Sequence, residues 1–187
     1  MTPMIAEGGF TRRELLKGGA VATLLLGAGG WIAARITDGH PQALAPLKHL
    51  GAAEQLMLAR VADVALGEVL PSDQAARNEW LTRIVQNADA GISALPLHLQ
   101  EDTKKLTSML AFAPTRLLLI GQWTGWQSVS REALQERLEA LRSSGNETRH
   151  AIYRVLRDMT LAAFYGDRRS WPLIGYAGPV VNRIENG

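Results

Sequence analysis

Cysteine is absent from this chain of 187 residues. The absence excludes disulfides, covalently attached c-type haem, thiolate-bound iron–sulfur clusters and a cysteine nucleophile. The protein therefore cannot carry electrons through any of these groups. If the chain is exported to an oxidising compartment, it reaches its stability there without a disulfide.

An excess of charge of one sign is also missing, because 20 basic residues stand against 18 acidic ones and the formal net charge is +2. Beyond the first residues, the arginines are mixed with Asp and Glu at helical spacing, and no basic block is interleaved with aromatic residues. Binding to nucleic-acid phosphates needs a basic patch or face. We therefore expect no nucleic-acid partner.

Catalytic and metal-binding motifs are lacking as well. The four histidines are far apart, and none has a second ligand at a metal-binding spacing: His40, His49, His98 and His150. The serines stand in capping or loop contexts rather than in the Gly-x-Ser-x-Gly turn that exposes a nucleophile. Glu68 is the carboxylate that we expect to be partly buried, and it has no evident catalytic partner. We therefore predict no catalytic, metal-binding or cofactor-binding residue in this chain.

The amino-terminal residues have the order of a twin-arginine export signal. Two adjacent arginines, Arg12 and Arg13, precede Lys17, and an uncharged, glycine-rich run follows over residues 18–34. We therefore predict that residues 1–34 are an export signal or membrane anchor and that residues 35–51 are a linker. The twin-arginine translocase would then deliver the folded chain to the periplasm.

Whether the leader is removed stays open. The small-x-small site at residues 43–45 is followed by Pro46, which signal peptidase tolerates poorly. A retained run of 17 uncharged residues is at the lower limit for crossing a bilayer. It would anchor the chain in the inner membrane with its body in the periplasm. The glycines over 27–30 also resemble a dinucleotide-binding turn, but the strand–helix repeat that such a site needs is missing.

The rest of the chain has the apolar periodicity of helices, and the alternation typical of strands is absent. We expect helices over 52–70, from the capping residues 72–73 to about 91, from 96 to 114, over 117–120, over 130–141 and over 146–165. The segment 117–120 is interpreted as a short central helix because it is the most apolar stretch. In the third helix, Leu99 and Met109 belong to the stripe expected to face inward. The predicted fold is all-α, an irregular bundle of five to six helices after an N-terminal signal helix.

Residues 166–187 break the helical pattern and mix aromatic residues with glycine and proline. We interpret them as a C-terminal arm of the helical domain 52–187, either packed back on the bundle or exposed for a partner. Exposed aromatic residues are typical of protein interfaces. We therefore assign Trp171, Tyr176 and Pro179 to a partner interface.

Three places in the chain together resemble the small-subunit family typified by gluconate 2-dehydrogenase subunit 3. They are the leader over 11–17, the first helix over 58–71, and the end of the chain over 161–179. The resemblance implies a gamma subunit that binds, in the cytoplasm, the large subunit of a glucose-methanol-choline type dehydrogenase and carries it through the membrane. It also implies that the large subunit holds FAD and oxidises a sugar or an alcohol, and that a cytochrome c subunit accepts the electrons.

The favoured hypothesis is therefore a non-catalytic subunit that escorts and stabilises a periplasmic FAD-dependent dehydrogenase. The alternative is a stand-alone exported helical protein that binds a small ligand between helices, lined by Trp123, Trp126 and Tyr153. If they do not line a ligand pocket, Trp123 and Trp126, which lie near Gly125 in the sequence, are expected to pack where two helices meet at a corner. An obligate subunit is expected to be poorly soluble or loosely folded alone, whereas a ligand-binding protein is expected to be stable and monomeric.

Overall fold

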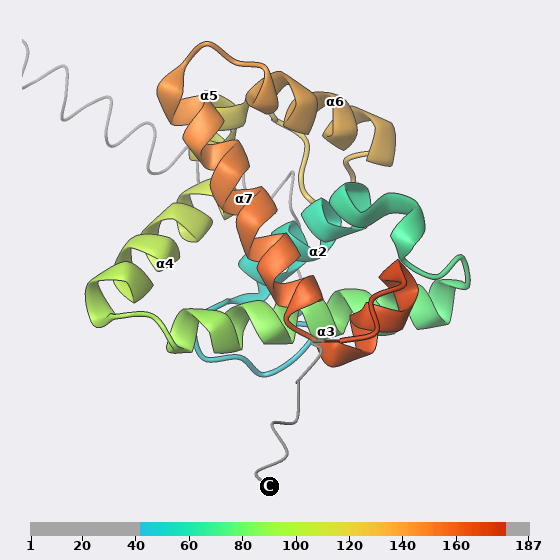
Figure 1. The fold of residues 1–187 in the computed structure, drawn as a ribbon. Coiled ribbons are helices and arrows are strands. Elements are labelled where there is room, and N and C mark those ends of the chain that lie inside the picture. The colour runs from blue at the N-terminus through green and yellow to red at the C-terminus, as the bar shows by residue number, and fades with distance from the viewer. Residues whose placement is uncertain (1–41, 179–187) are drawn as a thin grey trace, which may run out of the picture.

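The computed structural model describes residues 42–178, and these residues form an all-α bundle (Figure 1). The α-helices are α2 (Ala52–Leu66), α3 (Gln74–Ser93), α4 (Leu97–Ala111), α5 (Ala113–Ile120), α6 (Arg131–Arg142) and α7 (Glu147–Tyr165). Two 3-10 helices, η1 (Gly67–Val69) and η2 (Arg168–Ile174), follow α2 and α7. The predicted all-α class is confirmed, while the predicted signal helix lies outside the described residues.

Local capping explains where several helices begin. The side chains of Asp73, Ser130 and Asn146 each accept a hydrogen bond from the backbone N–H three residues further on. Such caps satisfy N–H groups that the helix itself leaves without partners, and each contributes about 1 kcal/mol. At the end of α5, Gly121 has a φ of 71°, the left-handed conformation that glycine adopts without steric penalty.

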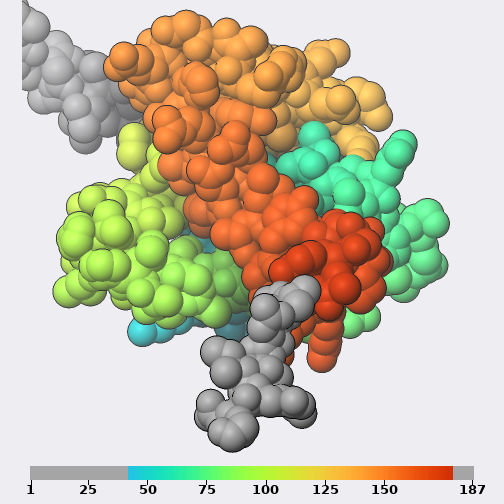
Figure 2. Space-filling view, viewed as in Figure 1, coloured from blue at the N-terminus to red at the C-terminus, as the bar shows by residue number. Residues whose placement is uncertain are grey.

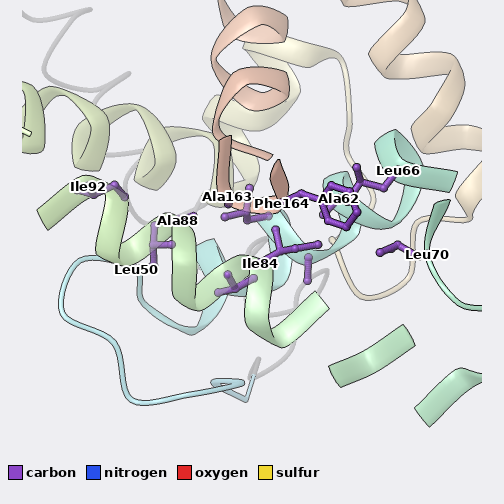
Figure 3. Close-up of a cluster of buried hydrophobic side chains, with 12 residues drawn as sticks. Leu50, Ala62, Leu66, Leu70, Ile84, Ala88, Ile92, Ala163 and Phe164 are labelled. Atoms are coloured by element: carbon purple, nitrogen blue, oxygen red, sulfur yellow. The ribbon is translucent and has the colours of Figure 1, made fainter. Parts of the chain in front are cut away.

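The core consists of two apolar clusters that share α2. The first joins α2, α3 and the end of α7, and Figure 3 shows Ile84 and Ala88 of α3 gathered with Ala62 and Phe164. The second joins α2 to α4, α6 and the first half of α7, with Leu110, Leu134, Leu141, Ile152 and Leu156 among its buried members. Because α2 contacts α3, α4, α6 and α7, it is the helix on which the bundle is assembled.

Residues 42–50, in the segment interpreted as a linker, pack on this bundle. The Asp89 carboxylate of α3 accepts hydrogen bonds from the backbone N–H groups of residues 48, 49 and 50 at 3.1, 2.7 and 2.9 Å. The side chain of Gln55, which is 1% exposed, bonds to backbone groups of residues 44, 45 and 50. Leu50 is thereby held in the first core cluster.

Arg116 and Trp126 organise the corner between α4, α5 and α6. The Arg116 guanidinium is fully buried and donates hydrogen bonds to the backbone carbonyls of residues 111, 122 and 123. It also lies 5.8 Å from the centroid of the Trp126 ring. Trp126 is 2% exposed, and its indole N–H donates to the carbonyl of Leu110 at 3.1 Å. Of the two tryptophans expected to pack at a helix–helix corner, Trp126 does so, whereas the Trp123 side chain is half exposed.

The expectation that residues 117–120 form a central helix is wrong. These residues are helical, but Leu117 is 42% and Leu118 is 82% exposed, and only Ile120 is buried. The eight-residue helix α5 packs only one face against its neighbours. Because this stretch is apolar on all sides, the opposite face exposes apolar side chains to solvent.

Two further expectations about helices also fail. In α4, Leu99 and Met109 are 42% and 45% exposed instead of facing the core, because the face that α4 buries carries Thr107, Leu110 and Ala111. The first helix ends as an α-helix at Leu66 and continues as η1, since Gly67 has a φ of 50°.

Candidate functional site

Two of the residues assigned to function from the sequence lie in the described part of the chain. They are Trp171 and Tyr176, whereas Arg12, Arg13 and Pro179 lie outside residues 42–178. Among the helices within 42–178, none combines the length and the apolar character that crossing a membrane requires. The site is therefore built below from the C-terminal arm and from the cavities of the bundle.

Residues 165–176 fold around the Trp171 side chain, and we call this segment the hook. The indole N–H of Trp171 donates to the carbonyl of Tyr165 at 3.0 Å, which ties the ring to the last turn of α7. The Tyr176 ring meets the Trp171 ring edge-on, with centroids 5.2 Å apart, and its backbone N–H donates to the Trp171 carbonyl. The Arg168 guanidinium lies 5.8 Å from the centroid of the Trp171 ring. Trp171 is therefore the half-buried centre of an ordered segment.

Within this arm, residues 168–174 form the 3-10 helix η2, which the sequence pattern did not indicate. The Asp167 carboxylate caps η2 by accepting the backbone N–H of Arg169 at 3.0 Å. The buried Ser170 hydroxyl donates to the Asp167 carbonyl at 2.8 Å. The side chain of Asn87 on α3 donates to the carbonyl of Ala163 at 3.0 Å and lies 3.4 Å from the Asp167 carboxylate. These hydrogen bonds hold the arm against α7 and α3.

Four large apolar or aromatic side chains at the end of α7 and on the arm are exposed to solvent, with exposed fractions of 44%, 43%, 39% and 47%: Tyr165, Leu173, Ile174 and Tyr176. We refer to these four side chains as the tail surface. Trp171 contacts one of them, Tyr176, through its ring. The two aromatic residues therefore have different roles. Trp171 mainly anchors the hook, whereas the exposed Tyr176 is available for contact with another molecule.

A second group of exposed apolar side chains, which the sequence analysis missed, lies on α4, α5 and the following turn. Its most exposed members are 71%, 82% and 50% accessible: Leu97, Leu118 and Trp123. Large apolar residues at helical spacing are usually buried, so their pattern in sequence indicates a core face. Only the packing of α4 and α5 on the bundle shows that these side chains point outward.

One cavity has a volume of about 850 Å³ and lies between α3, α7 and η2. Figure 2 shows the face on which α7 and η2 lie in front, with α4 beside α7. Apolar side chains such as Ile92 and Met159 line the cavity, and Arg83, Arg168 and Asp167 supply charged groups at its η2 end. The volume is in the range of cavities that hold small organic ligands.

The three aromatic residues proposed to line a ligand pocket do not meet in one cavity. Trp126 is buried in the corner, and Trp123 is 50% exposed. Tyr153 lines a separate cavity of about 540 Å³ together with Val61 and Leu138. The cavity between α3, α7 and η2 was missed because small side chains, including Ala88, Ala162 and Gly166, line much of it, and small residues give no distinctive signal in sequence.

The carboxylate and histidine side chains considered as candidate reactive groups lie apart from one another in the described residues. Glu68 is exposed rather than partly buried as expected, because it lies on η1 outside the packed face of α2. His49 pairs with the Ser93 hydroxyl at 2.9 Å, while His98 and His150 are exposed. No group of three or more His, Cys, Asp or Glu side chains suited to a metal ion occurs within 42–178.

A shift in pKa is found for one exposed ion pair on α6. A hydrogen bond from Arg142 lowers the pKa of Glu139 and, in turn, raises the pKa of Arg142. Both side chains are more than half exposed, so this pair is typical of a helix surface rather than of an active site.

Comparisons of the chain with family models, with curated proteins and with solved structures give no match. The class of protein that the structure defines is thus an all-α domain with an ordered, solvent-facing apolar tail.

Proposed function

We propose that this chain is a non-catalytic small subunit. It escorts an FAD-dependent dehydrogenase of the glucose-methanol-choline type through the twin-arginine pathway and stabilises it in the periplasm. The large subunit binds FAD and oxidises a sugar or an alcohol, and a cytochrome c subunit accepts the electrons.

The observation that carries this proposal is the tail surface. Hydrogen bonds and caps order the hook, yet four large apolar side chains on it remain between 39% and 47% exposed. An ordered apolar surface that the domain does not use for its own core is typical of a protein interface. The exposed side chains of α4 and α5 provide further apolar area of this kind.

The leader supports the export part of the proposal. The adjacent Arg12 and Arg13, followed by an uncharged run, are the pattern by which the twin-arginine translocase selects folded cargo. A large subunit without its own signal would be exported only while it is bound to this chain. The resemblance of the leader, first helix and chain end to the gluconate 2-dehydrogenase subunit 3 family supports the identity of that partner.

A second candidate function is supported by the cavity between α3, α7 and η2. Its volume of about 850 Å³ and its apolar lining suit a small ligand, as a stand-alone exported binding protein would require. In this alternative the ligand occupies that cavity, and the tail surface has no protein partner.

Purification of the chain with and without a co-expressed large subunit of the glucose-methanol-choline type tests the proposal. We expect the chain alone to be less soluble and to unfold at a lower temperature than in the complex, and to show no flavin, haem or metal spectrum. We expect the co-expressed chain to purify as a stoichiometric complex that contains FAD. The proposal would be refuted by a stable monomer that does not bind the large subunit, or by a stoichiometric cofactor in the isolated chain.

A further inference from the structure

A third cavity, of about 440 Å³, lies between α2, α3 and the start of α6 and is lined by three arginines. Arg60 comes from α2, Arg77 from α3, and Arg131 is the first residue of α6. The acidic residue among its described lining residues is Asp63. Three positive side chains against one negative side chain leave two positive charges without an opposite charge in the lining.

The single carboxylate is paired with two of the arginines. The Nε of Arg77 lies 2.5 Å from one oxygen of Asp63, and a terminal nitrogen of Arg131 lies 3.2 Å from the other. The terminal nitrogens of Arg77 donate to the backbone carbonyls of residues 63, 67 and 71. One negative charge is thus shared by two arginines, and Arg60 forms no ion pair with it within the described part of the chain.

Arg60 lines the cavity with an incompletely paired guanidinium. Its terminal nitrogen donates to the carbonyl of Val129, but its Nε is buried and has no hydrogen-bond partner within the described part of the chain. A buried N–H donor without a partner is costly, so the Arg60 side chain gains when an acceptor comes within its reach. An acceptor that also carries negative charge would offset the excess positive charge of the lining.

Two helix N-termini add to the positive potential of the cavity. Gln74, the first residue of α3, and Arg131, the first residue of α6, both line it. The N-terminus of a helix carries a partial positive charge and favours an anion. The nearby acids are engaged elsewhere, because Asp73 caps α3 and Glu79 pairs with Arg83.

We propose that this cavity binds a small oxyanion, such as a carboxylate or a phosphate, between Arg60 and Arg131. The planar guanidinium presents paired N–H donors that match the oxygens of these groups. Asn78 and Thr82 of α3, which also line the cavity, are polar residues beside the arginines. The inference rests on this cavity alone and does not depend on the proposed partner.

Thermal unfolding of the purified chain with succinate or inorganic phosphate tests the site, with sodium chloride at equal ionic strength as the reference. We expect one or both oxyanions to raise the Tm saturably, by roughly 5 °C or more at about one hundred times Kd. The comparison of succinate with phosphate distinguishes a carboxylate from a phosphate ligand. A Tm in both oxyanions equal to that in chloride would overturn the proposal.

Two variants and one control locate the effect. Arg131→Gln should weaken oxyanion binding about tenfold or more, because it removes a half-exposed donor from the cavity. Asp63→Asn should keep or enlarge the Tm shift, because it removes the competing carboxylate. Arg142→Gln removes an ion-paired arginine from the other end of α6 and should leave the shift unchanged. A full shift in Arg131→Gln, or none in Asp63→Asn, would contradict the assignment.

Discussion

At the scale of single residues, Arg116 is the buried charge on which the corner of α4, α5 and α6 depends. We predict that Arg116→Met destabilises the chain by about 3 kcal/mol or more, since it leaves backbone carbonyls without donors in the interior. The Tm should then fall by roughly 6–12 °C for a chain of this size. Arg142→Met, which removes an exposed arginine, is the control and should change the Tm little. Similar Tm values for both variants would show that Arg116 does not hold the corner.

Tyr176 is the exposed aromatic residue of the tail surface, and truncation should affect binding rather than folding. We predict that Tyr176→Ala weakens association with the large subunit by about 2 kcal/mol or more, roughly thirtyfold. The Tm of the isolated chain should change by less than about 2 °C, because the side chain is 47% exposed. Co-purification and thermal unfolding measure the two effects.

Trp171→Ala is the matched comparison for that experiment. It removes the hydrogen bond to the Tyr165 carbonyl and the ring that Tyr176 contacts, so it should lower both the Tm and the affinity. A large loss of Tm in Tyr176→Ala with the complex retained would place Tyr176 in the fold instead of the interface.

At the scale of elements, Asp89 of α3 attaches the segment before α2. We predict that Asp89→Ala releases residues 42–50, because three backbone N–H groups lose their acceptor and Leu50 loses its place in the core. Amide hydrogen exchange should become much faster at residues 48–50 while the centre of α2 stays protected. Asp158→Ala, on the exposed face of α7, is the control. Unchanged protection at 48–50 in Asp89→Ala would contradict this role.

The helices were largely predictable because their signals are local. Asp73, Ser130 and Asn146 stand where capping side chains satisfy the first N–H groups, and Gly121 stands where a left-handed residue ends α5. Such signals act over a few residues and do not depend on the rest of the fold.

The orientation of several faces could not be predicted, because it depends on which helices meet in space. Leu118 and Met109 look like core residues in sequence and are exposed in the bundle. Arg116 looks like a surface residue and is fully buried, because carbonyls from the following turn gather around it. The cluster of Arg60, Arg77 and Arg131 likewise forms only when three helices meet.

At the scale of the whole molecule, the described residues form a helical domain that ends in an arm with exposed apolar side chains. We propose that the leader provides the export signal and that the tail surface provides the contact with the large subunit. The aromatic residues in the sequence predicted an interface on the arm, but its 3-10 helix and its hook around Trp171 could be found only from the fold.

The most direct test of the central claim is the location of the large subunit when the leader is altered. Cells that co-express both subunits are fractionated, and FAD-dependent dehydrogenase activity and protein are measured in periplasm and cytoplasm. Arg12→Lys combined with Arg13→Lys keeps the charge but loses the guanidinium groups, and Arg154→Lys with Arg157→Lys on α7 is the control. We predict that the leader variant leaves the large subunit in the cytoplasm, whereas cells with the control variant export it. Normal periplasmic activity with the leader variant would contradict the proposed export role.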